Sequence, residues 1–534
     1  MTWVSRDGLA VRDLVPADLR RQWVERGHCP NRDLYTLFRG HVDAHPERVA
    51  VVDGSVDHPG ELTYAALDAR VRRLAATLAA ADLGPRDVIA IQVPGGRHAV
   101  VAELAVAALG ALALPYPAGP GTRDTVSLLG RSRARAVITG TADLAAQVRS
   151  VRHELPRLRQ VLVFGPALDG TRSLDELPTD SSWAPEPVDA EAPARVLVSS
   201  GSEAEPKMVA YSHNAMCGGR ANYLRAVRGA NPRDLVLVPL ASSFGSFGVP
   251  STIAAHGGTL VLAGTFGTAG ALRTITRHRP AHVFAVPTML RRMAEAAPSP
   301  GEDLSFLRAV VASGADLPAA TVEACRRRFG CPVINVYGSS DGVNCHTRTP
   351  GDGVGVPDPA VADVRVMDGE IQARGPMTPL CYVGSAELDA RYRLPGGWVR
   401  TGDRGAFDER GTLHVMGRLR QVAVRGGQNI SLAEVERHLG THPAVAEVAC
   451  VAVADPDLGE RVCAFVQTRR SGPTPTLAEL VGFLERTRGL ERRKLPEHLV
   501  IVAELPLGPT GKVCRRTLAD RSTAILGGRE AAVT

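Results

Sequence analysis

The segment LTYAALDARVRRLAATLAA at residues 62–80 is followed by the short apolar run VIAIQV at residues 88–93. In the longer segment, apolar residues recur at the spacing of one helix face, and Thr63 or Asp68 is available to cap the helix. The shorter run is apolar and rich in β-branched residues, as strands buried in parallel sheets are. Together the two segments predict a helix that leads into a buried strand.

The same alternation of helix and strand continues over the N-terminal three quarters of the chain, which is typical of layered α/β domains. Further strand-like runs are ALALPYP (111–117), RAVITG (135–140), QVLVFG (160–165), RVLVSSGS (195–202), DLVLVPL (234–240), GTLVLAG (258–264), HVFAVP (282–287) and AVVASG (309–314). Near residue 400 the pattern changes to a hairpin with a turn at 409–411, then a helix, two strands within 445–468 and a helix near 477–488. We therefore expect a large N-terminal α/β domain of parallel-rich sheets sandwiched by helices, residues 1–417, and a small α+β domain, residues 418–534.

Composition excludes several classes of protein. The 534 residues are 44% hydrophobic and 22% charged, which is ordinary for a globular chain and unlike a disordered tail, a collagen or a coiled coil. The nearly uncharged apolar stretch at residues 104–114 is too short to cross a bilayer, and we expect no signal peptide because Asp7 and Asp13 interrupt the first residues. The nine cysteines are scattered, so we expect a reduced cytoplasmic protein without disulfides or structural zinc. The net charge of +6 is diffuse and aromatics are only 4%, which argues against nucleic-acid binding.

Lysine stands at only three positions, Lys207, Lys494 and Lys512, in a chain otherwise rich in arginine. One interpretation is that a GC-rich genome has written arginine wherever either cation serves. In that background, a lysine marks a position where a compact ammonium is needed and a flat guanidinium does not serve. We therefore treat the lysines as candidates for chemistry.

The stretch VSSGSEAEPK at residues 198–207 runs from a strand into a loop of small hydroxyl residues and glycine, and ends at Pro206 and Lys207. Such loops present backbone N–H groups and hydroxyls to a phosphate. The glycine spacing is not that of a P-loop, and a polar surface turn is the plainer alternative for this stretch alone.

Four further segments follow this loop in order: VYGSSDG (336–342), WVRTGD (398–403), GRLRQVAVRGGQNISLAEVE (417–436) and LPLGPTGKVCRR (505–516). With the loop, they resemble the ordered motifs of the adenylate-forming (ANL) superfamily, which includes acyl-CoA synthetases, aryl-acid–AMP ligases and luciferases. The resemblance covers nearly the whole chain. YSHNAM (211–216) and RGGQNISLAEVERHL (425–439) are most similar to the aryl-acid–AMP ligases.

The resemblance implies a nucleotide site in which Tyr337 stacks on adenine and Asp403 accepts hydrogen bonds from both ribose hydroxyls. Arg418 would approach the ribose or the phosphate. Lys512 would be catalytic, neutralising charge as the bond between carboxylate oxygen and α-phosphate forms. The implied nucleotide-binding residues are Ser199, Ser200, Gly201, Ser202, Glu203, Lys207, Tyr337, Gly338, Ser340, Asp341, Asp403 and Arg418.

The resemblance also implies a second half-reaction with a thiol. Arg420, where family members carry lysine or aspartate, would be the hinge about which the small domain rotates between the two steps. Gly426 and Gly427 would line a narrow tunnel for a pantetheine arm, and we count Gly427 with Lys512 and Arg418 as catalytic. The implied ligands are the AMP moiety of an acyl-adenylate, ATP where adenylation is retained, coenzyme A and Mg²⁺. Lys494, in a turn where the family often has lysine, reads as structural.

The chain departs from the family pattern where phosphates would bind. The usual Thr-Gly of the loop is Glu203-Ala204, and the acidic residue of the second motif is Asp341, one methylene shorter than the usual glutamate. Asp341 is the candidate Mg²⁺ ligand, with a shorter reach. Two like charges ~4 Å apart at an effective dielectric constant of ~20 repel by ~4 kcal/mol, roughly a thousandfold in affinity. Ala204 also resists the positive φ that glycine allows.

This penalty falls mainly on ATP, because a finished acyl-adenylate carries only one charged phosphate. We therefore expect the chain to bind acyl-AMP and to transfer the acyl group to a thiol, with weak or lost adenylation and with a separate ligase supplying the adenylate. The presence of Lys512 argues against this hypothesis, and an orientation of Glu203 toward solvent would remove its basis.

The implied acid pocket contains seven residues near the ends of three strand-like runs: Ser242, Ser243, Phe244, Gly245, Ser313, Gly314 and Ser339. Ligases for 2-hydroxybenzoates carry His-Asn where Ser242 and Ser243 stand. Because serine is smaller and reaches less far, we expect a bulkier, mostly apolar acid, and the glycines at Gly245 and Gly248 agree with a roomy site. The leading acceptor is coenzyme A. The alternatives are a carrier protein's phosphopantetheine and a non-catalytic protein that binds acyl-AMP, and the oligomeric state stays open.

Overall fold

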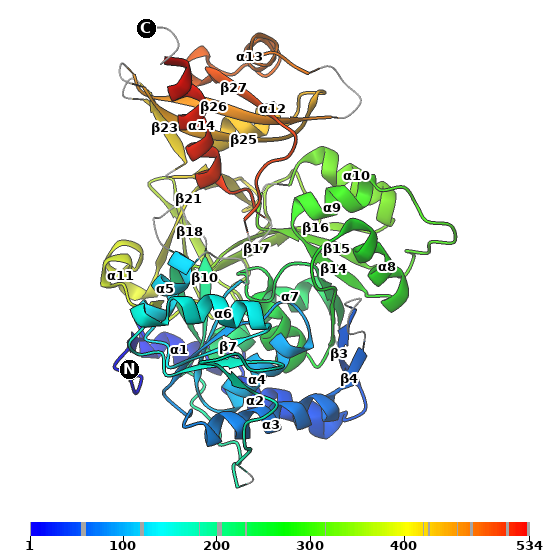
Figure 1. Cartoon of the computed structure of the whole chain (residues 1–534). Helices are drawn as coiled ribbons and strands as arrows, with labels where there is room; N and C mark the ends of the chain where they lie inside the picture. Colours follow the sequence, from blue (N-terminus) through cyan, green and yellow to red (C-terminus); the bar gives the residue numbers. More distant parts are fainter. Residues whose placement is uncertain are drawn as a thin grey trace. The chain divides into compact units, whose positions relative to one another are not determined.

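The computed structural model describes residues 2–54, 60–117, 122–180, 182–199, 206–229, 232–315, 317–419, 421–425, 428–455, 458–469, 474–508 and 512–530. Contacts divide the chain into two compact units, coloured along the sequence in Figure 1. The first unit contains Met1–Arg365 and Gln372–Thr401, and the second contains Val366–Ile371 and Gly402–Thr534. The two units are described separately.

The first sheet of the first unit has eight strands in the order β20-β11-β10-β6-β5-β7-β8-β9. Strands β10, β6, β5, β7, β8 and β9 pair in parallel, whereas β11 pairs antiparallel with both β10 and β20. The bounds are β5 Val88–Gln92, β6 Leu112–Pro115, β7 Ala136–Thr139, β8 Gln160–Val163, β9 Arg172–Ser173, β10 Pro193–Ser199, β11 Lys207–Ser212 and β20 Cys381–Tyr382. The parallel-rich sheet predicted from the apolar runs is confirmed.

The second sheet also has eight strands, in the order β17-β16-β15-β14-β12-β13-β3-β4. Its central strands are parallel, and each edge is an antiparallel hairpin, β16–β17 at one side and β3–β4 at the other. The bounds are β3 Val49–Asp53, β4 Gly60–Thr63, β12 Arg233–Val236, β13 Thr259–Leu262, β14 His282–Ala285, β15 Ala309–Ser313, β16 Val333–Ser339 and β17 Val343–Thr347. A separate short hairpin joins β1 Thr2–Val4 to β2 Ala10–Arg12.

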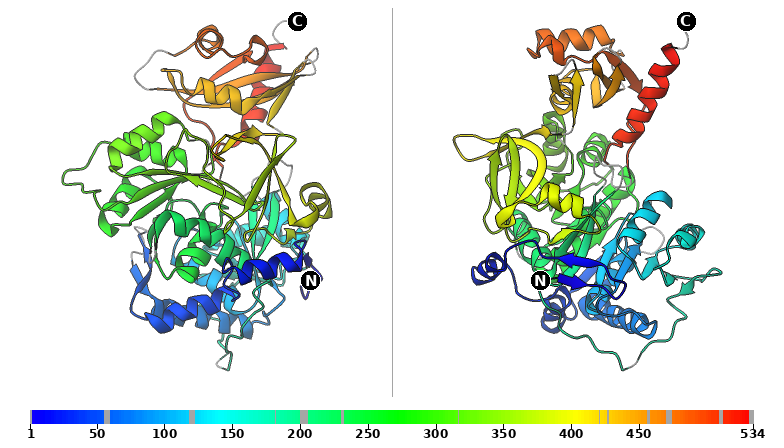
Figure 2. Two further views of the ribbon diagram at one scale, coloured as in Figure 1. Left: turned by 180° about the vertical axis from the view of Figure 1, so that it is seen from behind. Right: turned by 90° about the vertical axis from the view of Figure 1, so that its left-hand side faces the viewer.

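Helices cover these sheets. Their bounds are α1 Ala17–Glu25, α2 Leu34–Ala44, α3 Tyr64–Ala80, α4 Arg97–Ala108, α5 Thr122–Arg131, α6 Ala142–Ser150, α7 Arg220–Arg228, α8 Thr268–His278, α9 Pro287–Glu295, α10 Ala319–Phe329 and α11 Ala386–Tyr392. Helix α4 is buried from Ala99 to Ala108 and packs against α3 and α2. Helices α8, α9 and α10, drawn green, lie together beside the second sheet in Figure 2.

The predicted helix at residues 62–80 exists, and Thr63 is its cap. The Thr63 hydroxyl accepts a hydrogen bond from the backbone N–H of Ala66 at 3.2 Å. Asp68 lies one turn inside the helix, where its carboxylate accepts a hydrogen bond from the Tyr35 hydroxyl at 2.7 Å. The alternative cap is therefore wrong, because Asp68 is bonded to another helix.

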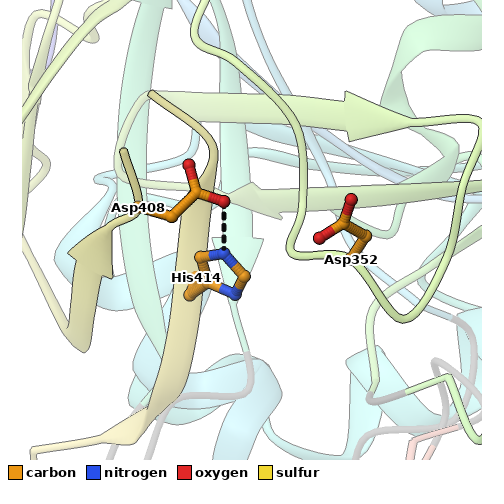
Figure 3. A group of neighbouring side chains, drawn as sticks. All are labelled: Asp352, Asp408 and His414. Atoms are coloured by element: carbon orange, nitrogen blue, oxygen red, sulfur yellow. Dashed lines mark hydrogen bonds and ion pairs between the residues drawn. The ribbon is translucent and has the colours of Figure 1, made fainter. Parts of the chain in front are cut away.

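A four-stranded sheet contains the points at which the chain passes between units, and its order is β18-β19-β21-β22. The bounds are β18 Asp363–Met367, β19 Glu370–Arg374, β21 Val399–Phe407 and β22 Leu413–Arg418. The predicted hairpin is β21–β22, and its turn is organised by Asp408, which accepts from the N–H groups of Arg410 and Thr412 at 2.9 Å each. Asp408 also bonds to His414 Nε2 at 3.1 Å (Figure 3). These bonds, those from Thr412 and His414 first, lower the pKa of Asp408 to about 2. Asp352, also drawn in Figure 3, belongs to the first unit.

The remaining sheet of the second unit has five strands, β24-β23-β26-β25 with β27 paired to β26. The bounds are β23 Val422–Arg425, β24 Gln428–Ser431, β25 Val445–Asp455, β26 Gly459–Thr468, β27 His498–Val502, α12 Leu432–Leu439, α13 Leu477–Arg486 and α14 Arg515–Glu530. Helix α13 begins with a capping box between Thr476 and Glu479. The two strands and the helix predicted here are present. Contacts assign residues 402–417 to the second unit, so the boundary at 417/418 stays a prediction about which part moves.

Within the described ranges, we find no helix with the length and apolar character that crossing a membrane requires.

Candidate active site

The predicted phosphate loop connects two antiparallel strands. Strand β10 ends at Ser199 and β11 begins at Lys207, and these two residues stand opposite each other in the register. Ser200, Gly201, Ser202 and Glu203 lie outside the described residues, so the effect of the Glu203 charge stays a prediction.

Lys207 is buried, with 8% of its surface exposed. Its Nζ lies 3.8 Å from the centroid of the Tyr392 ring and 5.8 Å from the centroid of the Tyr382 ring. An ammonium at such distances from aromatic rings is attracted by their π faces. The structure thus fixes the position of the loop lysine by contacts on β20 and α11, which lie far from it in sequence.

Asp341 is also buried and is bonded to hydroxyl groups on both of its oxygens. The Tyr382 hydroxyl donates to Oδ1, and the Ser339 hydroxyl donates to Oδ2 at 2.6 Å. Burial first, and then the negative Asp341, raises the pKa of Tyr382 well above its ordinary value, so this hydroxyl stays a donor. Each carboxylate oxygen keeps a second lone pair, so Asp341 suits the role predicted for it, that of a single carboxylate ligand to a Mg²⁺ that also binds phosphates.

The neighbouring motif residues lie on strand β16. Gly338 stands opposite Asn344, and a Cβ on Gly338 would come within 2.1 Å of Asn344 Oδ1. A larger residue at this position would therefore force the Asn344 side chain to move. Tyr337 is half-buried, which leaves part of its ring accessible for stacking, and Ser340 accepts a hydrogen bond from the Tyr211 hydroxyl at its carbonyl oxygen, 2.7 Å away. The adenine contact of Tyr337 remains a prediction.

In the second unit, the structure brings Asp403 and Arg418 together. They stand opposite each other on β21 and β22, and Arg418 Nε lies 2.7 Å from Asp403 Oδ1. The Asp403 residue is only 4% exposed, whereas the Arg418 side chain is 44% exposed. A buried carboxylate paired with a cross-strand arginine is held in a fixed orientation, which suits an acceptor of hydrogen bonds from ribose hydroxyls.

Lys512 lies close enough to Asp403 and Arg418 for both charges to act on its pKa. Surrounding protein that displaces water from the ammonium lowers the pKa of Lys512, the positive Arg418 lowers it further, and the negative Asp403 opposes both. Because the residue as a whole remains exposed, solvent screens these effects. All three residues belong to the second unit, so their proximity is a property of that unit. Tyr337 and Lys207 belong to the first.

The predicted acid-pocket residues separate into two groups. Ser313 ends β15 and Ser339 ends β16, and parallel pairing places these ends at one edge of the sheet, where α/β folds bind ligands. Gly314 follows with φ +93°, a conformation that favours glycine. These positions agree with a site at the carboxyl edge of the second sheet.

The group at residues 242–245 forms a tight turn. The Ser242 hydroxyl donates to the Pro239 carbonyl oxygen at 2.7 Å and accepts from the Gly245 N–H at 3.0 Å. Phe244 is half-buried, with its ring centroid 6.2 Å from that of Phe284. The expectation that Gly245 and Gly248 widen the pocket is wrong. A Cβ on Gly245 would meet Pro239 O at 2.2 Å, and one on Gly248 would meet Leu240 at 2.8 Å, so packing is what requires both.

Comparison with known proteins identifies the family. Residues 38–383 match the family of AMP-binding enzymes, and residues 434–512 match the AMP-binding enzyme C-terminal domain. The chain belongs to the adenylate-forming (ANL) superfamily.

Individual relatives span almost the whole chain. A salicylyl-CoA synthase / salicylate adenylyltransferase from a Streptomyces species is 32% identical, covering 95% of this chain and 96% of that protein. A salicyl-AMP ligase / salicyl-S-ArCP synthetase of Mycobacterium tuberculosis is 30% identical over 94% and 93% of the two chains. The solved amide bond synthetase McbA from Marinactinospora thermotolerans superimposes with a TM-score of 0.78 at 28% identity, over 91% and 99%.

Two further residues expected to act in the second half-reaction, Gly427 and the hinge Arg420, lie outside the described residues, as does Gly426. Lys494 is described, and its Nζ pairs with the Glu434 carboxylate at 2.9 and 3.1 Å. This lysine therefore joins helix α12 to the turn before β27, which is a structural role.

The sequence analysis did not identify a set of buried charged residues that bond to residues 240–246 of this adenylate-forming enzyme. Arg195 forms a buried ion pair with Glu103 and donates to the Leu240 carbonyl oxygen at 2.7 Å. Arg220 donates to the Ser243 carbonyl oxygen at 2.9 Å and to the Ser246 hydroxyl at 3.0 Å. A glutamate inside the apolar helix α4 and an arginine in the apolar strand β10 were the available signals, because isolated charges in buried elements need partners.

Proposed function

We propose that this protein joins a bulky, mostly apolar carboxylic acid to the thiol of coenzyme A through an acyl-adenylate. The observation that carries the proposal is the cluster of Asp403, Arg418 and Lys512, in which a buried carboxylate, a cross-strand arginine and a nearby ammonium occupy the positions of the family's motifs. The 32% identical relative, whose name describes both salicylate adenylylation and salicylyl-CoA formation, supports the same pair of half-reactions.

In the first half-reaction, a carboxylate oxygen of the acid attacks the α-phosphorus of ATP, and pyrophosphate leaves. Asp403 accepts hydrogen bonds from the ribose hydroxyls, and Lys512 offsets the negative charge that develops between the acid oxygen and the α-phosphate. Asp341 would hold a Mg²⁺ ion, which supplies charge neutralisation between phosphate oxygens. In the second half-reaction, the thiol sulfur attacks the acyl carbon, the thiol gives up its proton, and AMP leaves.

The two half-reactions are expected to be unequal. Glu203 and Ala204 replace Thr-Gly in the phosphate loop, and Asp341 is one methylene shorter than the glutamate usual in the family. Both features weigh against the β- and γ-phosphates of ATP more than against the single phosphate of an acyl-adenylate. We therefore place adenylation below thioester formation in rate, with a separate adenylating ligase as the source of acyl-AMP.

Restoring the loop tests this inequality. The double substitution Glu203→Thr, Ala204→Gly should raise acid-dependent exchange of pyrophosphate into ATP, because it removes a negative charge from the phosphate site. Thioester formation from a synthetic acyl-AMP, measured in parallel, should stay within about threefold. Unchanged exchange after loop restoration would contradict the role given to Glu203. The substitution Glu205→Gln is the matched control for charge elsewhere in the loop.

The proposed acid follows from the turn at residues 242–245. The Ser242 hydroxyl is bonded within that turn, so it offers no donor to a 2-hydroxyl group of a substrate. Beside it, Phe244 is half-buried and presents an apolar surface. Synthetic 1-naphthoyl-AMP and salicyl-AMP, each supplied with coenzyme A, distinguish the alternatives. We expect faster thioester formation from the naphthoyl compound, whereas a preference for salicyl-AMP would contradict the assignment.

A carrier protein is the alternative acceptor, favoured by the 30% identical relative whose name describes loading of an aryl carrier protein. Coenzyme A and a phosphopantetheinylated aryl carrier protein can be compared at equal concentration with the same acyl-AMP. Faster transfer to coenzyme A supports the proposal. Faster transfer to the carrier protein would show that the carrier, and not coenzyme A, is the acceptor. Tight binding of acyl-AMP without transfer to either thiol would indicate a binding protein instead of an enzyme.

A further inference from the structure

Two tyrosines outside the five segments singled out in the sequence flank the ammonium of Lys207. Tyr382 is the last residue of β20, which pairs with β11, and Tyr392 is the last residue of α11. The two ring centroids lie 5.6 Å apart, and Lys207 Nζ is 3.8 Å from the centroid of Tyr392. All three residues are buried. We call Tyr382 and Tyr392 the tyrosine seat, since cation–π attraction is strongest where water is excluded.

The tyrosine seat is attached to the second nucleotide motif. The hydroxyl of Tyr382 donates to Asp341, and the backbone N–H of Tyr382 donates to Asp389 Oδ1 at 2.8 Å. Tyr382 is thereby fixed at its backbone and at the far end of its ring. Asp341 is fixed in turn by the Ser339 hydroxyl at 2.6 Å. A continuous chain of contacts therefore runs from the carboxylate of one motif to the ammonium of the other.

We propose that Tyr392, with Tyr382, is a positioning residue that holds the Lys207 ammonium beside the phosphate loop, and that Asp341 orients this tyrosine seat through the Tyr382 hydroxyl. The inference rests on the proposed function only in assigning Lys207 to nucleotide phosphates. It also gives Asp341 a role for which its length suffices, because the carboxylate reaches Tyr382 directly. The neutral alternative is that the two rings only fill the apolar core, of which both are members.

A double-mutant cycle separates these interpretations. We would measure ATP dissociation constants by calorimetry for the full chain, Tyr392→Leu, Lys207→Met and the double variant. If Tyr392 acts through Lys207, Tyr392→Leu weakens ATP binding by about five- to thirtyfold in the parent, in the range of a buried cation–π contact. In the Lys207→Met background the same substitution changes ATP binding by less than about twofold. Equal losses in both backgrounds, or no loss in the parent, would overturn the proposal.

The conservative variant Tyr392→Phe supplies the rescue. It keeps the ring and removes the hydroxyl, so we expect ATP affinity within about twofold of the parent. If Phe behaves like Leu, the π face is not what holds Lys207 and the proposal is wrong. Thermal unfolding of each variant identifies a fold defect, in which case Tyr392→Met replaces the leucine variant. If the parent binds ATP too weakly to measure, the cycle is run in the Glu203→Thr, Ala204→Gly protein.

Failure of this inference is distinguishable from failure of the proposed function. The cycle reports ATP affinity, whereas the proposed function is tested by thioester formation from acyl-AMP. A protein that makes no thioester but shows the coupling between Tyr392 and Lys207 keeps the tyrosine seat and loses the assigned reaction. A protein that makes the thioester but shows no coupling between Tyr392 and Lys207 would support the proposed reaction and contradict the role of the tyrosine seat.

Discussion

Lys207 and Lys512 carry the same charge in the two units but lie in opposite surroundings. Lys207, the first residue of β11, is buried against the rings of Tyr382 and Tyr392, and its Nζ lies 3.8 Å from the centroid of the Tyr392 ring. Lys512 is exposed, and its pKa is lowered by the surrounding protein and by Arg418. The first lysine is therefore positioned by packing, and the second is adjusted by neighbouring charges. This difference suits a fixed phosphate contact in one unit and a group that enters and leaves the reaction in the other.

A large effect on nucleotide binding is expected at the carboxylate beside Lys512. Asp403→Asn keeps the shape of the side chain but removes the charge that pairs with Arg418 and that would accept the ribose hydroxyls. Loss of charge-assisted hydrogen bonds of about 1.5–3 kcal/mol should weaken AMP binding by about ten- to a hundredfold. Calorimetric titration with AMP measures this change.

Asp408→Asn is the matched control for Asp403→Asn, since Asp408 lies in the turn of the same hairpin and bonds to Arg410, Thr412 and His414. AMP affinity should be unchanged in this variant. If both substitutions weaken AMP binding equally, the β21–β22 hairpin as a whole matters and Asp403 has no special role.

The next effect separates the two half-reactions. Lys512→Met should slow pyrophosphate exchange by about a hundredfold, as removal of a group that stabilises developing charge does. Exchange is best measured in the Glu203→Thr, Ala204→Gly protein, where we expect it to be fastest. Thioester formation from synthetic acyl-AMP should change by less than about threefold. Lys494→Met, which removes a lysine paired with Glu434, should leave both rates near those of the parent. Equal slowing of both half-reactions by Lys512→Met would contradict the division of roles.

The pH dependence of exchange should move when Arg418 is removed. The pKa of Lys512 is lowered in part by the positive Arg418, so Arg418→Ala should raise it. A reaction that needs the protonated ammonium is lost as pH rises through this pKa. The alkaline limb of the pH–rate profile should therefore shift to higher pH in the variant. A shift to lower pH, or none, would show that Arg418 does not act on Lys512.

The smallest effect concerns stability around Lys207. Tyr382→Phe removes the donor to Asp341 and leaves a buried carboxylate oxygen without that hydrogen bond. The expected loss is about 1–3 kcal/mol in the free energy of unfolding, measured by denaturant titration. Tyr392→Phe, which leaves the Asp341 bond in place, should cost less. A larger loss at Tyr392 would indicate that its hydroxyl contributes more to stability than that of Tyr382.

Local patterns were sufficient to predict much of the fold. Alternating apolar runs and amphipathic segments predicted the parallel-rich sheets, and the hairpin near residues 409–411 and helix α13 were found where expected. The resemblance of their motifs to the adenylate-forming superfamily implied a common site for Asp403 and Arg418, and their cross-strand register explains why they meet.

Contacts between distant segments could not be predicted in the same way. Tyr382 and Tyr392 lie more than 170 residues beyond Lys207, and nothing in their local sequence indicates an ammonium partner. The choice between Thr63 and Asp68 depended on Tyr35, which lies in another helix. Gly245 and Gly248 suggested open space, but the carbonyl oxygen of Pro239 presses on Gly245, and the side chains of Leu240 and Leu260 press on Gly248. In each case the contact depends on how the chain folds back on itself, which a local sequence pattern does not show.

We expect thioester formation from an adenylate to outpace formation of the adenylate itself. The most direct measurement supplies one protein preparation with coenzyme A and either synthetic 1-naphthoyl-AMP or 1-naphthoate plus ATP and Mg²⁺, and follows naphthoyl-CoA by chromatography. Thioester formation should be rapid from the adenylate and at least tenfold slower from the acid with ATP. Equal rates by both routes, or no thioester from the adenylate, would contradict this expectation.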